Sequence, residues 1–179
     1  MTNVQAQDLQ TQPKPRLSRI IHYKWLYLIA AGIVVFDQAT KTWIHTNLAF
    51  GTYHPSDPGR ITVIPDFFHI VHLGNTGAAW GIFQGMSQWL ALLGILAVVV
   101  IYFCRHHFGL NKLPVQISFG LLCGGIIGNV VDRFIHGYVI DFLDFRFGDY
   151  AWPAFNIADA GIVTGVILYM ITSFFEKEE

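Results

Sequence analysis

Charged side chains are scarce in this chain of 179 residues. Aspartate, glutamate, lysine and arginine make up 13% of the sequence, whereas about a quarter of a typical soluble chain is charged. The few charges nearly cancel, with a formal net charge of −1, so we expect no nucleic-acid partner. Hydrophobic residues make up 53% of the chain, which indicates that much of it is solvated by lipid rather than by water.

Cysteine is almost absent, and no metal-binding pattern occurs. Cys104 and Cys123 fall inside or at the end of apolar stretches, so we expect no disulfide. The spacing of zinc sites and the H-E-x-x-H motif are both missing. His69 and His72 lie three apart in an expected strand, which would point them to opposite faces. We therefore expect neither a metal nor a cofactor.

Long apolar runs, by contrast, are abundant. A membrane-spanning helix needs roughly 20 mostly apolar residues. Four stretches fit this length, and the first is interrupted by Asp37 and Lys41: 25–48, 85–104, 113–131 and 151–175. We predict an all-α membrane protein with four transmembrane helices, forming a single domain over residues 21–175. Residues 1–20 are predicted to be a disordered cytoplasmic tail and residues 176–179 a second tail.

The basic residues are unevenly distributed between the connections. They cluster before the first stretch and between the second and third: Lys14, Arg16, Arg19, Lys24, Arg105 and Lys112. Since cytoplasmic loops carry the excess of lysine and arginine, both termini and residues 105–112 are predicted to be cytoplasmic. Residues 46–84 and 134–152 then face outward.

The outward segment between the first two stretches carries a β-strand pattern. Residues 60–65 and 67–73 are rich in β-branched and aromatic side chains and predict a small β-element at the membrane surface. Two roles remain open for it. In the first, the edge of the sheet binds an extended peptide as a further strand. In the second, the sheet only covers the ends of the helices.

Rows of glycine predict close helix packing. Gly120, Gly124 and Gly128 recur every fourth residue in the third stretch, and Gly161 and Gly165 do so in the fourth. Such rows let helices approach closely in lipid. We expect the third and fourth helices to pack together, which brings their outer ends close to one another.

The acidic residues provide few candidates for chemistry. All three glutamates lie in the last four residues, so every other acid is an aspartate. At a rise of about 1.5 Å per residue, Asp159 lies ~6 Å inside the fourth stretch. Asp141 follows the break at Gly137 after the third stretch and comes out at a similar depth on the same side. An ionisable group near lipid is read as functional.

Other polar residues fall into supporting roles. Asp37 and Lys41 are four apart on one helix face, and we interpret them as a structural pair. Asp144 is either in a loop salt bridge or supports Asp141. Three amides in apolar settings need partners and predict a polar cluster around the aspartates: Asn75, Asn129 and Asn156.

Two aspartates within hydrogen-bonding range share one proton, because both do not ionise easily. The charged carboxylate deprotonates a water, and the protonated one assists the carbonyl and the leaving amine. Paired acids in membrane helices also mark proton relays. A small proton-coupled transporter or channel subunit, using Asp37 and Asp159, is therefore the alternative function, and a purely structural membrane protein is the third.

Five sequence blocks, in order along residues 36–162, closely resemble the bacterial lipoprotein signal peptidase (signal peptidase II) family. They are Phe36-Asp-Gln-Ala-Thr-Lys41, Asn75-Thr-Gly-Ala-Ala-Trp-Gly81, Gly124-Gly-Ile-Ile-Gly-Asn-Val-Val-Asp-Arg133, Gly137-Tyr-Val-Ile-Asp-Phe142 and Phe155-Asn-Ile-Ala-Asp159. Five blocks in the right order are far more specific than any single one.

The resemblance implies an aspartyl endopeptidase of the bacterial inner membrane, with its active site near the periplasmic face. It implies that Asp141 and Asp159 are catalytic. Supporting positions carried over from the family are Asp37, Asn75, Asn129, Arg133 and Asn156. The implied substrates are prolipoproteins that already carry diacylglycerol, cut just before the lipidated cysteine. The implied partners also include membrane phospholipid and globomycin-type inhibitors.

Overall fold

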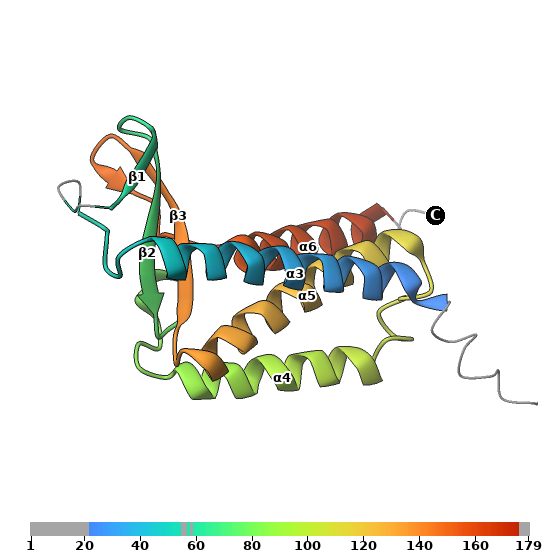
Figure 1. Cartoon of the computed structure of the whole chain (residues 1–179). Helices are drawn as coiled ribbons and strands as arrows, with labels where there is room; N and C mark the ends of the chain where they lie inside the picture. The colour runs from blue at the N-terminus through green and yellow to red at the C-terminus, as the bar shows by residue number, and fades with distance from the viewer. Residues whose placement is uncertain (1–21, 55–56, 58, 176–179) are drawn as a thin grey trace, which may run out of the picture.

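The computed structural model describes residues 22–54, 57 and 59–175. The tails predicted at residues 1–20 and 176–179 lie outside the described residues. Four long helices make up more than half of the described residues: α3 (Lys24–Asn47), α4 (Ser87–Phe103), α5 (Leu113–Ile135) and α6 (Ile157–Phe175). A short 3-10 helix, η1 (Ala79–Gly81), precedes α4. The four long helices coincide with the four apolar stretches of the sequence. Both ends of the described chain lie at the end of the helices away from the sheet (Figure 1).

Two of the described helices, α5 and α6, are long and apolar enough to cross a membrane. The helix α4 is apolar but has only 17 residues. The helix α3 has 24 residues, but its second half carries Asp37, Gln38 and Lys41, which lower its mean hydropathy. The described residues thus do not confirm the predicted count of four spans.

A four-stranded antiparallel sheet stands across one end of the helices (Figure 1). Its strands follow in the order β1 (Ile61–Ile64), β2 (Phe68–Asn75), β3 (Val139–Phe147) and β4 (Tyr150–Ala151). The strands predicted at 60–65 and 67–73 are confirmed as β1 and β2. The predicted mostly helical architecture with a small β-element between the first two helices is thus present, but the sheet is larger than predicted, because β3 and β4 come from the connection between α5 and α6.

The sheet is fixed to the helices by a small apolar cluster. Ile44 and Leu48 at the end of α3 pack against Ile140 and Phe142 of β3, and all four are buried. This contact holds β3 directly against the C-terminal end of α3.

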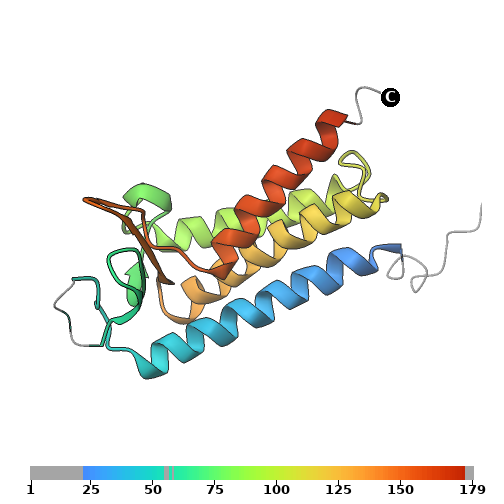
Figure 2. The ribbon, with the colours of Figure 1, turned by 90° about the horizontal axis from the view of Figure 1, so that it is seen from above.

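The helix α5 is the centre of the bundle and packs against the other three (Figure 2). The predicted packing of α5 on α6 is confirmed, but the glycine row has another partner. A Cβ at Gly120 or Gly124 would meet Ile29, Ala30 and Ile33 of α3. The close approach of α5 to α6 is made by Gly125, where a Cβ would clash with the carbonyl oxygen of Ala158, and by the predicted Gly161 and Gly165 of α6, which face the backbone of α5.

We predict that Gly125→Ala separates α5 from α6 and destabilises the fold by about 1–3 kcal/mol, because the backbone carbonyl of Ala158 has no room to yield. Thermal unfolding in detergent measures the change. The matched control is Gly32→Ala in α3, where a Cβ meets nothing within 4 Å. Equal stability of the two variants would contradict the packing described.

Candidate active site

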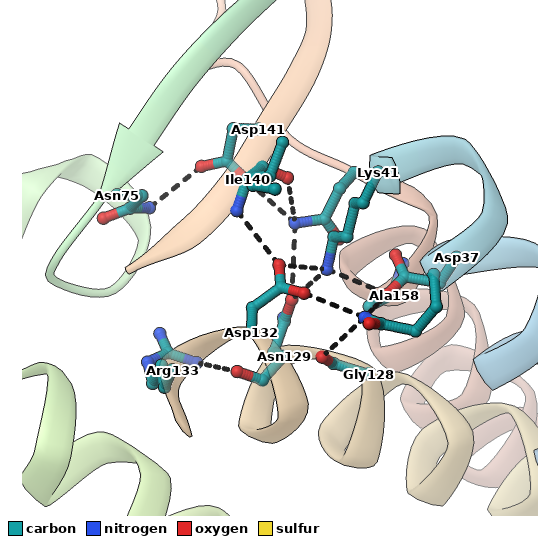
Figure 3. A network of polar contacts seen from close by, with 12 residues as sticks. Asp37, Lys41, Asn75, Gly128, Asn129, Asp132, Arg133, Ile140, Asp141 and Ala158 are labelled. Atoms are coloured by element: carbon teal, nitrogen blue, oxygen red, sulfur yellow. Dashed lines mark hydrogen bonds and ion pairs between the residues drawn. The ribbon is translucent and has the colours of Figure 1, made fainter. Parts of the chain in front are cut away.

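Asp141 is positioned by the pairing of β3 with β2. Leu73 lies opposite Asp141 and Asn75 lies opposite Val139, so Asn75 is the diagonal neighbour of Asp141 on one face of the sheet. The side-chain nitrogen of Asn75 donates to Asp141 Oδ2 at 3.0 Å (Figure 3). The Asn75 oxygen accepts from the backbone N–H of Gly77 at 2.9 Å, which fixes the orientation of the amide.

Asp159 is positioned by the first turn of α6. The backbone N–H of Asp159 donates to Asn156 Oδ1 at 2.9 Å, and the backbone N–H of Asn156 faces Asp159 Oδ2 at 3.4 Å. This reciprocal pair is the capping-box arrangement of a helix N-terminus. It holds the Asp159 carboxylate at the helix end where backbone N–H groups favour negative charge.

Asn156 links the two acids. Its side-chain nitrogen donates to Asp141 Oδ1 at 2.7 Å, while its oxygen accepts from Asp159. The chain before Asn156 runs back along β3, since the N–H groups of Phe142 and Leu143 both donate to Phe155 O. One amide therefore bonds to both aspartates, as the sequence predicted for a shared polar cluster.

Asn129 of α5 completes the contacts of Asp159. Its side-chain nitrogen donates to Asp159 Oδ1 at 2.7 Å. Its oxygen accepts from Lys41 Nζ at 3.1 Å and from the side chain of Asn156 at 3.3 Å. The oxygens of Asn75, Asn129 and Asn156 are thus each bound by N–H donors, and their NH2 groups face the carboxylates.

The pKa of Asp141 is strongly perturbed. Burial, and then the negative charge of Asp159, raises the pKa of the Asp141 carboxyl to about 7. The hydrogen bonds from Asn75 and Asn156 act in the opposite direction. Near neutral pH, Asp141 is therefore poised between its protonated and ionised forms, as acid–base catalysis requires.

Beneath the two acids lies a buried ion cluster around Lys41. Its ammonium contacts Asp37 Oδ2 at 2.8 Å and Asp132 Oδ2 at 2.9 Å, and it also donates to Asn129 (Figure 3). All three charged side chains are at most 1% exposed. The predicted Asp37–Lys41 pair is present, but sequence reasoning missed Lys41 as a contact of the site.

Asp37 and Asp132 connect this cluster to the backbone that carries the two acids. Asp37 Oδ1 accepts from the N–H of Ala158 at 2.9 Å, and Asp132 Oδ2 accepts from the N–H of Ile140 at 3.0 Å. Gln38 donates to Asp132 Oδ1 at 2.8 Å. Asp132 and Gln38 were not predicted as site residues. The sequence offers one indication of their role, because Asp132 and Gln38 are adjacent to Arg133 and Asp37, which were predicted as site residues.

Arg133 supports the site by donating hydrogen bonds to backbone carbonyl oxygens rather than to a carboxylate. Its guanidinium donates to the carbonyls of Gly77 at 2.9 Å and of Asn129 at 3.3 Å. It therefore holds the turn after Asn75 against α5. Asp144 lies in β3, fully buried and paired with Arg146 at 2.9 Å, so the salt bridge expected in a loop is in a strand.

Over the described ranges, no group of three or more histidine, cysteine or acidic residues has the arrangement of a metal site. His69 and His72 are both buried in β2, and His72 Nδ1 lies 3.0 Å from the carbonyl oxygen of Leu48. The polar chemistry of the site is therefore carried by carboxylates, amides and one ammonium.

The fold is similar to solved structures of bacterial membrane enzymes. One such enzyme, determined by the in meso method at 2.3 Å resolution, matches with a TM-score of 0.75 and 36% identity, over 85% of this chain and 88% of that chain. A second, at 1.9 Å resolution, matches with a TM-score of 0.70 and 37% identity, over 82% of this chain and 90% of that one.

Residues 29–175 match the protein family described as Signal peptidase (SPase) II. The lipoprotein signal peptidase of Bacillus pumilus is 38% identical over 146 residues, 81% of this chain and 89% of that protein. The corresponding protein of Listeria welshimeri is 32% identical over 155 residues, 87% of this chain and 96% of that protein. The chain belongs to the signal peptidase II family, and it is a bacterial membrane protein.

We predict that Lys41→Met destabilises the protein by about 3–5 kcal/mol, because it leaves Asp37 and Asp132 as buried charges without their cation. Thermal unfolding in detergent tests this. The control is Lys24→Met, which removes an exposed ammonium at the start of α3 and should change stability by no more than about 0.5 kcal/mol. A similarly small effect at Lys41 would show that the cluster is not needed for folding.

Proposed function

We propose that this protein is an aspartic endopeptidase that removes signal peptides from diacylglyceryl-modified prolipoproteins, cutting just before the lipidated cysteine. One observation carries the mechanism. Two carboxylates from different elements both contact Asn156, Asp141 through the side-chain nitrogen of Asn156 and Asp159 through its backbone N–H, and the charge of Asp159 raises the pKa of Asp141. Membership of the signal peptidase II family supports the substrate class.

In the proposed reaction the ionised Asp159 takes a proton from a water molecule. The water oxygen attacks the carbonyl carbon of the scissile peptide bond, while the proton of Asp141 passes to the carbonyl oxygen. When the tetrahedral intermediate collapses, the C–N bond breaks and the leaving amine takes up a proton from the aspartate pair. The products are the signal peptide carboxylate and the free amino group of the lipidated cysteine.

Two features support this assignment of base and acid. Asp159 lies at the N-terminal end of α6 and accepts a hydrogen bond from Asn129, and both stabilise its carboxylate. Asp141 lies on a strand without such a helix end, and its pKa of about 7 leaves it protonated in an appreciable fraction of molecules near neutral pH. We therefore assign the shared proton to Asp141 before water attacks.

The remaining predicted residues have positioning roles in this proposal. Asn75 and Asn156 hold Asp141, and Asn129 holds Asp159. Asp37 anchors the N-terminal turn of α6 through the N–H of Ala158. Arg133 fixes the turn at Gly77.

We further propose that residues 21–175 form one domain with four transmembrane helices and both termini in the cytoplasm. This arrangement puts the aspartates near the outer face of the inner membrane. Each buried methylene of the substrate's acyl chains contributes about 0.8 kcal/mol, so lipid would hold the scissile bond at the depth of the aspartates. Phospholipid and globomycin-type inhibitors are expected partners.

In the alternative function, a proton-coupled transporter or channel subunit, Asp37 would relay protons together with Asp159. Both oxygens of Asp37 are engaged, one by Lys41 and one by the N–H of Ala158. These contacts support a structural role for Asp37 and favour the peptidase.

We predict that Asp141→Asn and Asp159→Asn each reduce cleavage of a diacylglyceryl-modified precursor by at least about 10³-fold, because the pair can no longer share one proton. The assay is a gel shift with purified protein in detergent. Asp149→Asn, in the exposed turn before β4, is the matched control and should cleave normally. Full activity of either site variant would refute the mechanism, and equal cleavage of an unlipidated precursor would refute the role given to the lipid.

The raised pKa of Asp141 also predicts a pH-dependent stability. Between about pH 4 and pH 7 the folded protein binds the Asp141 proton more tightly than the unfolded chain does, so the free energy of unfolding decreases as pH rises through this window. Asp141→Asn removes the effect. The stability of the wild type relative to this variant should therefore fall by on the order of a few kcal/mol between pH 4 and pH 8.

Thermal unfolding of both proteins across this pH range measures the difference. It separates the titration of Asp141 from any constant loss of hydrogen bonds in the variant. Asp149→Asn should show no such trend. A difference that is independent of pH would mean that Asp141 titrates alike in the folded and unfolded chains.

A further inference from the structure

A second feature lies at the end of the bundle away from the sheet. A cavity of about 140 Å³ opens there between the start of α3, the end of α4 and the middle of α5. Its lining includes Tyr27, Ala30, Val98, Tyr102, Arg105 and Cys123. The helix α4 packs along α5 but makes little contact with α3, and the two are seen apart at this end in Figure 1.

The cavity has a closed floor and an open rim. Tyr23, Leu110 and Cys123 form part of its lining and are each at most 8% exposed. Tyr27 and Tyr102 at the rim are 44% and 55% exposed. In a membrane protein this apolar groove opens to lipid, so an acyl chain matches both its chemistry and its surroundings.

A single cation lies at the rim of the groove. Arg105 donates to the carbonyl oxygen of Tyr102 at 2.7 Å, and its guanidinium lies 4.8 Å from the centre of the Tyr102 ring. None of the ion pairs found among the described residues involves Arg105. A guanidinium held in this way and not neutralised by a described acid suits a phosphate group, which it recognises with paired N–H donors.

We propose that this groove is a binding site for one anionic phospholipid, with an acyl chain between α3 and α4 and its phosphate on Arg105. The lipid would fill the space where these helices do not pack together and so stabilise the position of α4. The helical segment of a signal peptide is a poorer occupant. A helix is about 10 Å wide, and the basic residues that precede a signal peptide's apolar segment would be repelled by Arg105.

Native mass spectrometry of the full chain in a neutral detergent tests the proposal, with phosphatidylglycerol and phosphatidylcholine of identical acyl chains as probes. The wild type should bind phosphatidylglycerol about fivefold more tightly, as one arginine near a lipid headgroup predicts. Arg105→Gln should abolish this preference. Lys24→Gln, which removes a cation at the same end but does not line the groove, should retain it.

A second pair of variants tests the acyl-chain site independently of charge. Val98→Phe places a larger side chain in the groove and should weaken binding of both lipids. Val99→Phe adds the same side chain at a neighbouring exposed position of α4 outside the lining and should not. Thermal unfolding in lipid-free detergent establishes that each variant is folded, and Arg105→Lys, which keeps the charge, should retain part of the preference if Arg105→Gln is unstable.

Four results would overturn the proposal. Equal binding of the two lipids by the wild type would show that Arg105 does not select an anionic headgroup. If Lys24→Gln lost the preference for phosphatidylglycerol as fully as Arg105→Gln, the preference would reflect general electrostatic attraction and not a site at Arg105. Displacement of phosphatidylglycerol by a synthetic signal peptide would assign the groove to substrate. Glycerol phosphate without acyl chains should not compete, and competition by it would show an ion site without a lipid groove.

Discussion

The buried ammonium of Lys41 is the interaction on which the rest of the site depends. One cation binds two carboxylates, Asp37 and Asp132, and all three residues are buried, so removing the cation would leave two buried charges unpaired. Through these acids it reaches the backbone of Ala158 in α6 and of Ile140 in β3. The same ammonium holds the oxygen of Asn129. The ion cluster therefore sets both the positions of α6 and β3 and the orientation of an amide at the site.

Asp141 and Asp159 accept hydrogen bonds from asparagine side chains. Asp37 and Asp132 are instead paired with the ammonium of Lys41. A carboxylate bonded only to neutral NH2 groups keeps its negative charge less firmly than one paired with a cation, so a proton competes for it. Asp141 has such a setting, with Asn75 and Asn156 as its partners. The structure thus separates its acids into two kinds: those neutralised by Lys41, which hold the fold, and the pair near the sheet, which is suited to exchanging a proton.

Much of this arrangement could be predicted because its signals are local. The four apolar stretches and the strands β1 and β2 are visible in composition and alternation, and helix rise predicts that Asp141 and Asp159 lie at the same end of the helices, where both contact Asn156. The strand β3 was missed since its partner, β2, lies more than 60 residues earlier and its residues were read as a connection. The packing partner of Gly120 and Gly124 was assigned to α6 rather than α3 because a row of small residues shows that a helix comes close, but not which one.

The sequence by itself determined which residues are the candidates for chemistry, since acids and amides in an apolar chain are few and their blocks resemble one family. Only the tertiary structure decided how they meet. The diagonal pairing of Asn75 with Asp141 depends on strand register, and the link from Asn156 to both acids depends on the chain returning along β3. Likewise, Lys41 is one member of a helical pair in the sequence, but in the fold it is the common partner of polar groups on two helices, α3 and α5. The contacts Asn75–Asp141, Asn156–Asp141 and Lys41–Asn129 join residues 66, 15 and 88 positions apart, and local propensity carries no information about such separations.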